Sequence, residues 1–325
     1  MLVAMVDVLE HLVRAPATPA AVNDLNAWFG RLGECPFTLP IDRALWAGFA
    51  ADRLGYAFVG GYRAALARLF TWGAEALAGS TGGTYAWPSI GARLSLAATE
   101  ARGAHPRAIE TTLSDEGGAL VLRGVKTFAT LASAADELLV VASRGIEPDG
   151  KPRLVLVRVR SNASGVRIED RAPTPFAPEI PHARVTLADV TVASDDLLPG
   201  DGYAVYLKPF RTIEDTHVLA AALGHVLGAA RAHGFGPSMA EGALALANAL
   251  REVAARAPTD PVAHVALAGL FTAAKRLIAE HDLEWEKADA ATRDRWRRDL
   301  GLLMIAETAR QQRTSAAWTL LGSQT

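Results

Sequence analysis

The sequence has one cysteine, Cys35, among 325 residues. A single cysteine excludes an intramolecular disulfide and most cysteine metal sites, and it fits a reducing, cytoplasmic compartment. The histidines show no spacing typical of metal ligands, so no metal site is predicted. The chain also lacks a strong imbalance of charge: 33 Lys and Arg residues face 35 Asp and Glu residues, a formal net charge of -2. This balance gives no electrostatic basis for nucleic-acid binding.

Several common functional patterns are missing as well. No uncharged apolar run reaches the roughly 20 residues of a membrane helix, so no membrane span is predicted. No Gly-x-Ser-x-Gly step occurs, which argues against a hydrolase nucleophile elbow. The glycine-rich run 79–84 is not followed by Gly-Lys-Ser/Thr and is therefore no phosphate loop.

The periodicity of apolar residues divides the chain into three parts. Residues 1–91 have apolar side chains at helical spacing, with helices predicted over 22–32 and 41–70 and Asp42 as an N-cap. From residue 92 the period changes to two and turns become frequent. Seven short strands are predicted, at 94–98, 119–122, 137–142, 153–159, 165–168, 183–187 and 190–192. Short strands without intervening helices indicate an antiparallel β-domain, over 92–205.

Residues 206–325 read as helical again. Four helices are predicted, over 209–233, 238–257, 260–287 and 289–321, separated by glycine and proline. Their short connections favour a four-helix antiparallel bundle. The runs 219–223 and 244–247 are rich in Ala and Leu on more than one helix face, and a helix that is apolar around most of its circumference must be buried on most of it. We therefore predict at least a dimer, within an α+β multidomain fold of helical part, β-domain and helical bundle.

Four segments in the middle of the chain resemble the middle domain of the acyl-CoA dehydrogenase family. They are Thr99-Glu100, then Gly124-x-Lys126-x-Phe128-Ala129-Thr130, then Asp189-Val-Thr-Val192, and finally Leu197-Leu-Pro-Gly200. The likeness covers about residues 92 to 230, and the order helix, β-domain, helix is also that of the family. The stretch 120–135, read from its residues alone, suggests two short strands that meet at Arg123-Gly124.

The resemblance implies a bound FAD and names its contacts. In the family, an aromatic residue at the position of Phe128 packs beside the flavin ring, and the threonine at the position of Thr130 reaches its reactive edge. Thr99 and Glu100 match the step beside the flavin pyrimidine. His105 lies in a cofactor loop one residue shorter than the family's, where it either replaces a hydroxyl contact or faces solvent. From the residues alone, Phe128 and Thr130 also fit ordinary strand positions.

The resemblance also implies a carboxylate base. The base near the C-terminus in most of the family has no counterpart, because this sequence ends about where that region begins. A minority place the glutamate on the first C-terminal helix, ten residues before a glycine, and Glu214 precedes Gly224 by ten residues. Glu214 is therefore the predicted base, with a solvated residue near a helix start as the alternative. Asp215 would raise its pKa if both were desolvated, and His217 is one turn away.

These features predict a cytoplasmic FAD flavoprotein that oxidises an acyl thioester, such as an acyl-CoA, at its α,β bond as a homodimer or homotetramer. It resembles a short, divergent and C-terminally truncated member of the family. Two alternatives remain. Related families use the same scaffold for flavin monooxygenation. A non-catalytic paralogue that acts as a partner or scaffold is favoured by the short cofactor loop and by missing Arg and Gln contacts to the cofactor.

Overall fold

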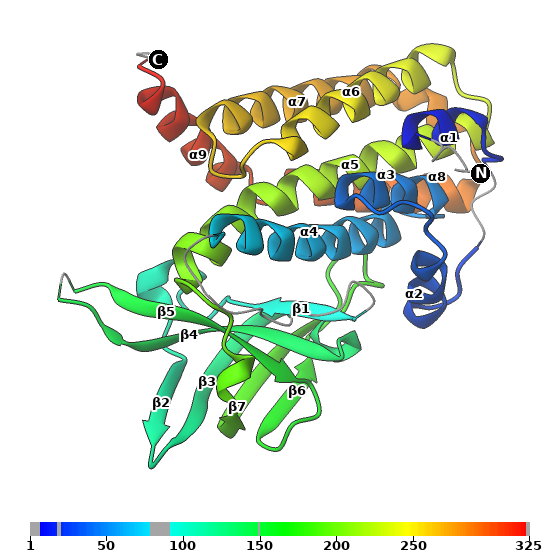
Figure 1. Cartoon of the computed structure of the whole chain (residues 1–325). Helices are drawn as coiled ribbons and strands as arrows, with labels where there is room; N and C mark the ends of the chain where they lie inside the picture. Colours follow the sequence, from blue (N-terminus) through cyan, green and yellow to red (C-terminus); the bar gives the residue numbers. More distant parts are fainter. Residues whose placement is uncertain (1–6, 18–20, 79–91, 149, 323–325) are drawn as a thin grey trace, which may run out of the picture. The chain divides into compact units, whose positions relative to one another are not determined.

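The structure is a computed structural model that describes residues 7–17, 21–78, 92–148 and 150–322. It forms two compact units. The helical unit comprises Met1–Arg68, Pro175–Glu179 and Arg211–Thr325, and the sheet unit comprises Leu69–Thr174 and Ile180–Phe210. Helices at both ends of the sequence with a β-sheet between them confirm the predicted fold class (Figure 1). The domain boundaries at residues 91 and 205 stay a prediction, and the run 79–84 lies outside the described residues.

Most helices lie close to the predicted ranges, but two of those ranges each contain two helices. Their bounds are α1 Val8–Arg14, α2 Leu25–Gly33, α3 Pro40–Ala50, α4 Leu54–Ala76, α5 Lys208–Ala232, α6 Pro237–Ala255, α7 Pro261–Glu280, α8 Ala290–Asp299 and α9 Glu307–Leu320. The predicted helix 289–321 is thus two helices, joined by the 3-10 turn Leu300–Met304. Ala306 precedes α9 with a left-handed φ of 61°, a conformation that a right-handed helix cannot include.

The prediction that Asp42 is an N-cap is wrong. The predicted range 41–70 contains two helices, and the first of them, α3, begins at Pro40 with Leu39 as its N-cap. Proline suits the first helical turn because its φ is already fixed near the helical value. Asp42 lies inside that turn, is buried, and accepts a hydrogen bond from Arg251 at 2.9 Å (Nε to Oδ1).

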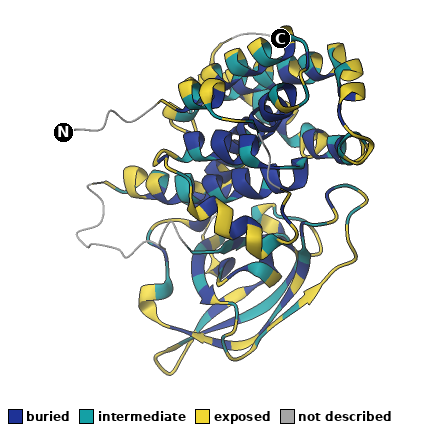
Figure 2. Cartoon of the chain, turned by 90° about the vertical axis from the view of Figure 1, so that its right-hand side faces the viewer, coloured by how far each residue is buried: buried dark blue, intermediate teal, exposed yellow. Residues whose placement is uncertain are grey.

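The middle of helix α5, from Leu219 to Leu223, is buried on all sides within the chain. The residues from Leu219 to Leu223 are each at most 3% exposed, and Figure 2 shows dark blue helices enclosed by outer ones with yellow faces. A Cβ at Gly224 would lie 2.2 Å from the carbonyl oxygen of Leu45, and one at Gly48 would lie 1.8 Å from that of Ala221. The backbones of α3 and α5 therefore approach to a distance that only glycine permits.

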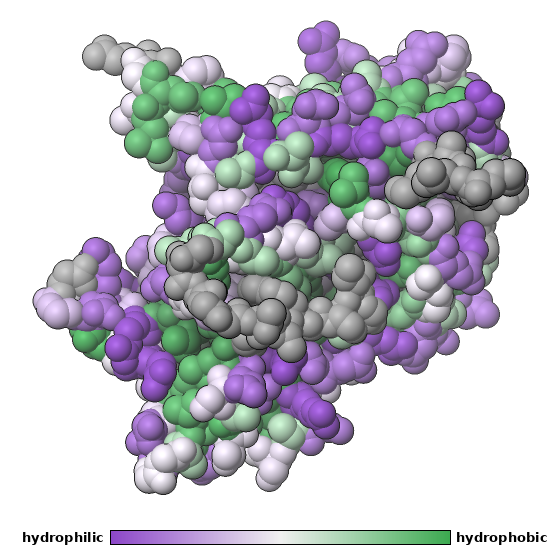
Figure 3. All heavy atoms as spheres, in the orientation of Figure 1, coloured by the Kyte–Doolittle hydropathy of each residue, from purple (hydrophilic) through white to green (hydrophobic). Residues whose placement is uncertain are grey.

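This burial removes one basis for the predicted oligomer, since the run 219–223 needs no second subunit to cover it. Other apolar side chains remain exposed. Leu320 and Leu321, at the end of α9, are 76% and 44% exposed, and apolar atoms gather at that end of the molecule in Figure 3. The oligomeric state stays a prediction.

Among the described helices, only α7 is long and apolar enough to cross a membrane by length and composition. Its buried residues recur every three or four positions, at Ala263, Leu267, Phe271, Ala274 and Ile278. This is the stripe of an amphipathic core helix, and α7 packs against α6 and α9.

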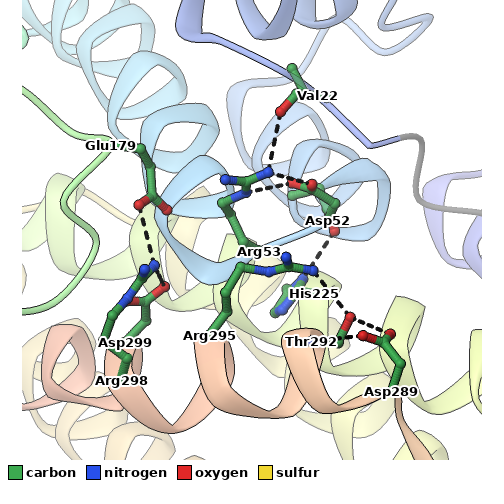
Figure 4. A network of polar contacts seen from close by, with 11 residues as sticks. Val22, Asp52, Arg53, Glu179, His225, Asp289, Thr292, Arg295, Arg298 and Asp299 are labelled. Carbon is green, nitrogen blue, oxygen red and sulfur yellow. Dashed lines mark hydrogen bonds and ion pairs between the residues drawn. The ribbon is translucent and has the colours of Figure 1, made fainter.

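Polar contacts hold the segment Pro175–Glu179 in the helical unit (Figure 4). The fully buried carboxylate of Asp299 accepts hydrogen bonds from the Ala177 amide and from Arg298 Nε, each at 2.6 Å. Arg298 also donates to Glu179, at 3.3 Å. Because charged and polar donors surround the Asp299 oxygens, the cost of burying this carboxylate is offset.

The sheet unit contains a seven-stranded sheet in the order β1-β4-β2-β3-β7-β6, with β5 paired to β4. The strands are β1 Leu94–Ala97, β2 Thr112–Glu116, β3 Ala119–Thr130, β4 Glu137–Ile146, β5 Pro152–Arg160, β6 Val166–Asp170 and β7 His182–Val192. Most neighbours are antiparallel, as predicted, whereas β1 and β2 pair with β4 in parallel. The sequence pattern missed β2, whose residues Thr-Leu-Ser-Asp-Glu include one large apolar side chain.

Strand β3 is one continuous strand and not two. It runs through Arg123 and Gly124 along β7, and the pairing register shifts between Leu122 and Gly124. Gly124 therefore marks a bulge in the strand, and the predicted junction of two strands at this point is wrong. Strand β7 likewise covers both of the predicted strands 183–187 and 190–192, because Asp189 adopts a positive φ of 54° without ending the pairing.

Candidate functional site

Three of the predicted cofactor residues lie together in the sheet unit. Thr99 forms an antiparallel bridge with Phe128, and the Thr127 amide donates to the Thr99 carbonyl at 2.8 Å. Phe128 and Thr130 are two residues apart on β3, so their side chains share one face of the sheet. The residue opposite Thr130 on β7 is His182, which therefore belongs to the same face.

A second bulge in β3 turns Phe128 outward. The register with β7 shifts between Lys126 and Ala129, so that three steps along β3 match two along β7. An extra residue of this kind re-aims the side chains that follow it. Lys126 and Ala129 are fully buried on one side of the bulge, whereas Phe128 is 37% exposed on the other. An exposed aromatic ring between two threonines is a suitable surface for a flat aromatic ligand.

Glu100 faces the opposite way, into the core of the sheet unit. Its carboxylate accepts hydrogen bonds from Lys126 Nζ at 2.6 Å, from the Thr111 hydroxyl at 2.7 Å, and from the amides of Glu110 and Thr111 at 2.7 and 3.1 Å. Lys126 Nζ also donates to the Val141 carbonyl at 2.6 Å. Lysine and glutamate are almost never fully buried unless they are paired, and here the pair is buried at 0% and 5% exposure.

Both groups of this pair remain charged. Burial alone would raise the pKa of Glu100, but the hydrogen bond and the charge of Lys126, with the other donors, leave that pKa below its ordinary value. Burial lowers the pKa of Lys126 to about 8, against the opposing effect of Glu100. At neutral pH the core of the sheet unit therefore contains an ammonium ion bound to a carboxylate.

The same network explains Gly124. Its φ is +152°, and a Cβ at this position would lie 2.4 Å from the Thr111 hydroxyl and 2.7 Å from the Thr111 Cα. Thr111 cannot move aside without losing its hydrogen bonds to Glu100. The Gly-x-Lys step is therefore a requirement of the buried ion pair.

His105 lies at the rim of an open pocket in the sheet unit. Its Nδ1 accepts a hydrogen bond from the Arg107 amide at 3.3 Å, at the start of the turn Pro106–Ala108. The pocket has a volume of about 740 Å³ and is lined by His105, Pro106, Arg107, Glu147, Pro148, Lys151, Pro152, Arg153, Asp201 and Tyr203. Its charged lining comprises three cations and two carboxylates, and the carboxylate of Asp201 is already bound by the amides of Tyr203 and Ala204.

Glu214 lies in the second turn of α5, in the helical unit, and is half-buried. Burial raises its pKa to about 7, and the adjacent Asp215 carboxylate adds to this, while Arg211 and Arg313 oppose it. Asp215 itself is bound by two arginines of α9: Arg310 donates to it at 3.0 Å, and Arg313 donates to its other oxygen. Asp215 is thus part of an ion-pair cluster, whereas Glu214 has a pKa close to neutrality.

Comparison with known proteins identifies the sheet unit. Residues 95–190 match the acyl-CoA dehydrogenase, middle domain family. These residues form an acyl-CoA dehydrogenase middle domain. The predicted resemblance to the acyl-CoA dehydrogenase family is thereby confirmed. None of the curated protein sequences matches this chain.

Solved structures extend the likeness to the whole fold. Butyryl-CoA dehydrogenase from Megasphaera elsdenii superposes with a TM-score of 0.65 at 13% identity, covering 98% of this chain and 100% of that one. Dibenzothiophene monooxygenase from Paenibacillus sp. A11-2 superposes with a TM-score of 0.64 at 17% identity, covering 91% and 87%. Its complex with FMN and indole gives a TM-score of 0.64 at 18% identity, with the same coverage. At these identities the likeness shows the fold alone.

Within the acyl-CoA dehydrogenase fold, the structure separates the predicted residues into three places. Thr99, Phe128 and Thr130 share one sheet face, His105 lines the pocket, and the Glu100 carboxylate is committed to the core. His217 does not bond to Glu214: its Nδ1 donates to the Ile213 carbonyl at 2.7 Å, and its buried Nε2 has no partner among the described residues. Within the described part of the chain, no three His, Cys, Asp or Glu side chains are grouped to hold a metal ion.

We expect Lys126→Met to lower the free energy of unfolding by about 3–5 kcal/mol, because it leaves the Glu100 carboxylate buried without its cation. Urea unfolding followed by circular dichroism measures this loss. Lys126→Met combined with Glu100→Gln should be more stable than Lys126→Met alone, since it removes the unpaired charge and the amide oxygen still accepts the two hydrogen bonds from Thr111.

Lys208→Met serves as the matched control, because Lys208 is exposed and its removal should change the free energy of unfolding by less than about 0.5 kcal/mol. A double variant as unstable as Lys126→Met would contradict the role assigned to the ion pair.

Proposed function

We propose that this chain is a flavin-dependent oxidoreductase that oxidises an acyl thioester at the α,β carbon–carbon bond. The observation that carries the proposal is the exposed Phe128 ring between Thr99 and Thr130 on one face of an acyl-CoA dehydrogenase middle domain. The fold shared with butyryl-CoA dehydrogenase supports the reaction class. FAD is the proposed cofactor, and the cytoplasm is the proposed location.

The residues on this face fit a flavin. The Phe128 ring offers a flat apolar surface on which an aromatic ring system stacks, and threonine hydroxyls both donate and accept hydrogen bonds at a ring edge. The neighbouring His182 has a buried Nδ1 without a partner among the described residues, an atom that a polar ligand edge would satisfy. When bound, the flavin supplies the acceptor for a hydride.

We assign Glu214 as the base. Oxidation at the α,β bond removes a proton from the α-carbon and a hydride from the β-carbon, and the carbons keep the remaining pair as a double bond. A general base is most effective when its pKa is near the working pH. The pKa of Glu214, about 7, meets this condition, and Asp215, which is bound by Arg310 and Arg313, does not compete for the role.

The pocket lined by His105 supports a substrate carried on a phosphate-bearing group. Arg107, Lys151 and Arg153 bring three cationic side chains to one open pocket beside the aromatic ring of Tyr203. Cations recognise phosphate, and an aromatic ring stacks on a base such as adenine. This combination favours an acyl-CoA over a free acyl thioester.

A flavin monooxygenase is the second candidate. The observation in its favour is the equally close superposition with dibenzothiophene monooxygenase, at a TM-score of 0.64. The same scaffold therefore accommodates a different use of a flavin. The substrate, rather than the fold, distinguishes the two reactions.

The first test is reconstitution of the purified protein with FAD and, separately, with FMN. We expect a bound flavin with a shifted absorbance spectrum, because transfer from water to a stacked site changes its surroundings. Adding butyryl-CoA under anaerobic conditions should bleach the absorbance near its visible maximum as the flavin is reduced.

Two other outcomes have distinct meanings. A protein that binds flavin, is inert towards thioesters and oxygenates an aromatic substrate with externally reduced flavin would be a monooxygenase. A protein that binds neither flavin would be a non-catalytic relative acting as a partner or scaffold, and the proposed activity would be wrong.

The second test concerns Glu214. We expect the rate of flavin reduction by an acyl thioester to rise with pH through about 7, because the base acts only in its ionised form. Glu214→Gln should slow reduction by roughly 10²- to 10⁴-fold while flavin binding is retained, and stopped-flow absorbance measures both. Glu241→Gln, an exposed carboxylate on α6, is the matched control.

Asp215→Asn sharpens this test. It removes a negative charge that raises the pKa of Glu214, so the midpoint of the pH profile should move to a lower pH. An unchanged midpoint, or a Glu214→Gln protein reduced as fast as the parent, would reject Glu214 as the base.

The third test concerns the pocket. We expect Arg107→Gln with Arg153→Gln to raise the KM for an acyl-CoA by about 2- to 30-fold, the effect of losing two exposed charge contacts. The KM for the same acyl group on N-acetylcysteamine, which lacks the phosphates and adenine, should not change. Arg102→Gln is the control, because Arg102 pairs with Glu110 and does not line the pocket. If the KM rises equally for both thioesters, the pocket does not bind the phosphate-bearing group of the acyl-CoA.

A further inference from the structure

Two residues outside the family's motifs surround Phe128 in the sheet unit. The His182 ring, from β7, stacks on Phe128 with ring centroids 4.3 Å apart and an angle of 24° between the planes. The guanidinium carbon of Arg171, which follows β6, lies 5.7 Å from the centroid of the Phe128 ring. Phe128 is thus flanked by a second aromatic ring and by a cation.

Arg171 is fixed to both neighbouring strands. Its Nη1 donates to the Thr127 carbonyl of β3 at 3.0 Å, and its amide donates to the His182 carbonyl of β7 at 2.8 Å. A side chain held by a hydrogen bond at its charged end keeps that charge in one place. Arg171 therefore presents a fixed positive charge next to the stacked rings.

His182 is held neutral beside this charge. Burial lowers its pKa, and the Arg171 cation lowers it further. A neutral imidazole has one N–H donor and one acceptor nitrogen. Its Nδ1 is buried and has no hydrogen-bond partner among the described residues, and an unpaired buried polar atom is unfavourable. A ligand edge with a complementary donor or acceptor would remove that cost.

We propose that Arg171 and His182 are cofactor-positioning residues, which fix the Phe128 ring by packing against it and place a fixed positive charge beside the bound flavin ring. This inference rests on the proposed function, because it requires a flavin at Phe128. Reduction adds negative charge to a flavin, so a nearby cation stabilises the reduced form more than the oxidised form. Arg171 should therefore raise the reduction potential of the bound flavin as well as its affinity.

A purely structural reading makes a different prediction. If Arg171 and His182 only tie β3, β6 and β7 together, their removal lowers thermal stability and leaves the potential of the bound flavin unchanged. The reduction potential thus separates a positioning role from a structural one.

The experiment uses the full chain reconstituted with FAD and compares Arg171→Met, Arg171→Lys, His182→Gln and His182→Leu with the parent. Flavin affinity is measured by fluorescence quenching, the potential by equilibration with a reference dye, and stability by thermal unfolding. Arg171→Met should bind FAD about 2- to 30-fold more weakly, the effect of removing one cation beside an aromatic ring system, and its flavin should have a lower reduction potential. Arg171→Lys keeps the positive charge, so the reduction potential of its bound flavin should stay close to that of the parent.

His182→Leu should weaken FAD binding more than His182→Gln, which retains a donor and an acceptor. Arg167→Met is the matched control, since Arg167 is on β6 and pairs with Glu169 at the surface. It should change neither affinity nor potential.

The outcomes are distinguishable. If the parent binds no flavin, both this inference and the proposed function are wrong. If the parent binds FAD, and Arg171→Met binds it as tightly and at the same potential, this inference alone is wrong. Should Arg171→Met fail to fold, Arg171→Lys and the two His182 variants decide: an unchanged affinity in His182→Leu would overturn the proposal.

Discussion

The ion pair of Lys126 and Glu100 lies at the centre of the sheet unit, and several strands depend on it. Lys126 is on β3 and donates to a carbonyl of β4, Glu100 follows β1, and Thr111 precedes β2. One buried charge pair thus connects four strands, each through a hydrogen bond that has no replacement in an apolar core. Such a pair gives less stability than well-packed apolar residues would, but breaking one partner is costly. We therefore expect the pair to favour this arrangement of strands over arrangements that leave either charge unpaired.

Gly124 and Lys126 in the recognisable motif serve this core, whereas Phe128 and Thr130 of the same motif lie on the face where we place the cofactor. Gly124 is needed because Thr111 lies against its Cα, and Lys126 is needed because Glu100 is buried. The motif could be recognised in the sequence because few residue types satisfy such constraints. The roles of its individual residues could not be predicted, because the inward direction of Glu100 depends on pairing between strands far apart in sequence. No local pattern reports whether a Thr-Glu step at a strand end faces the core or a ligand.

The sequence pattern predicted the elements that have a regular stripe of buried apolar residues and missed a strand that has none. The helices and six regions of strand were predictable because apolar spacing of 3.6 or 2 follows from having one buried face. Strand β2 was missed because only Leu113 of its residues is buried. The apolar circumference of α5 predicted burial correctly, but a sequence cannot say whether the cover is another helix of the same chain or a second copy. Here α3 and α5 meet through Gly48 and Gly224.

The inward direction of Lys126 and the outward direction of Phe128 require a break in the regular alternation of side chains along β3. A regular strand directs residues two apart to the same face, which would bury Phe128 with Lys126 or expose both. The bulge between Lys126 and Ala129 breaks this alternation, so that the core keeps its cation while the aromatic ring reaches the surface. The extra residue also brings Thr127, whose carbonyl binds Arg171, into position beside the ring. A single inserted residue in β3 therefore separates the structural charge of the core from the fixed charge at the face where we place the flavin.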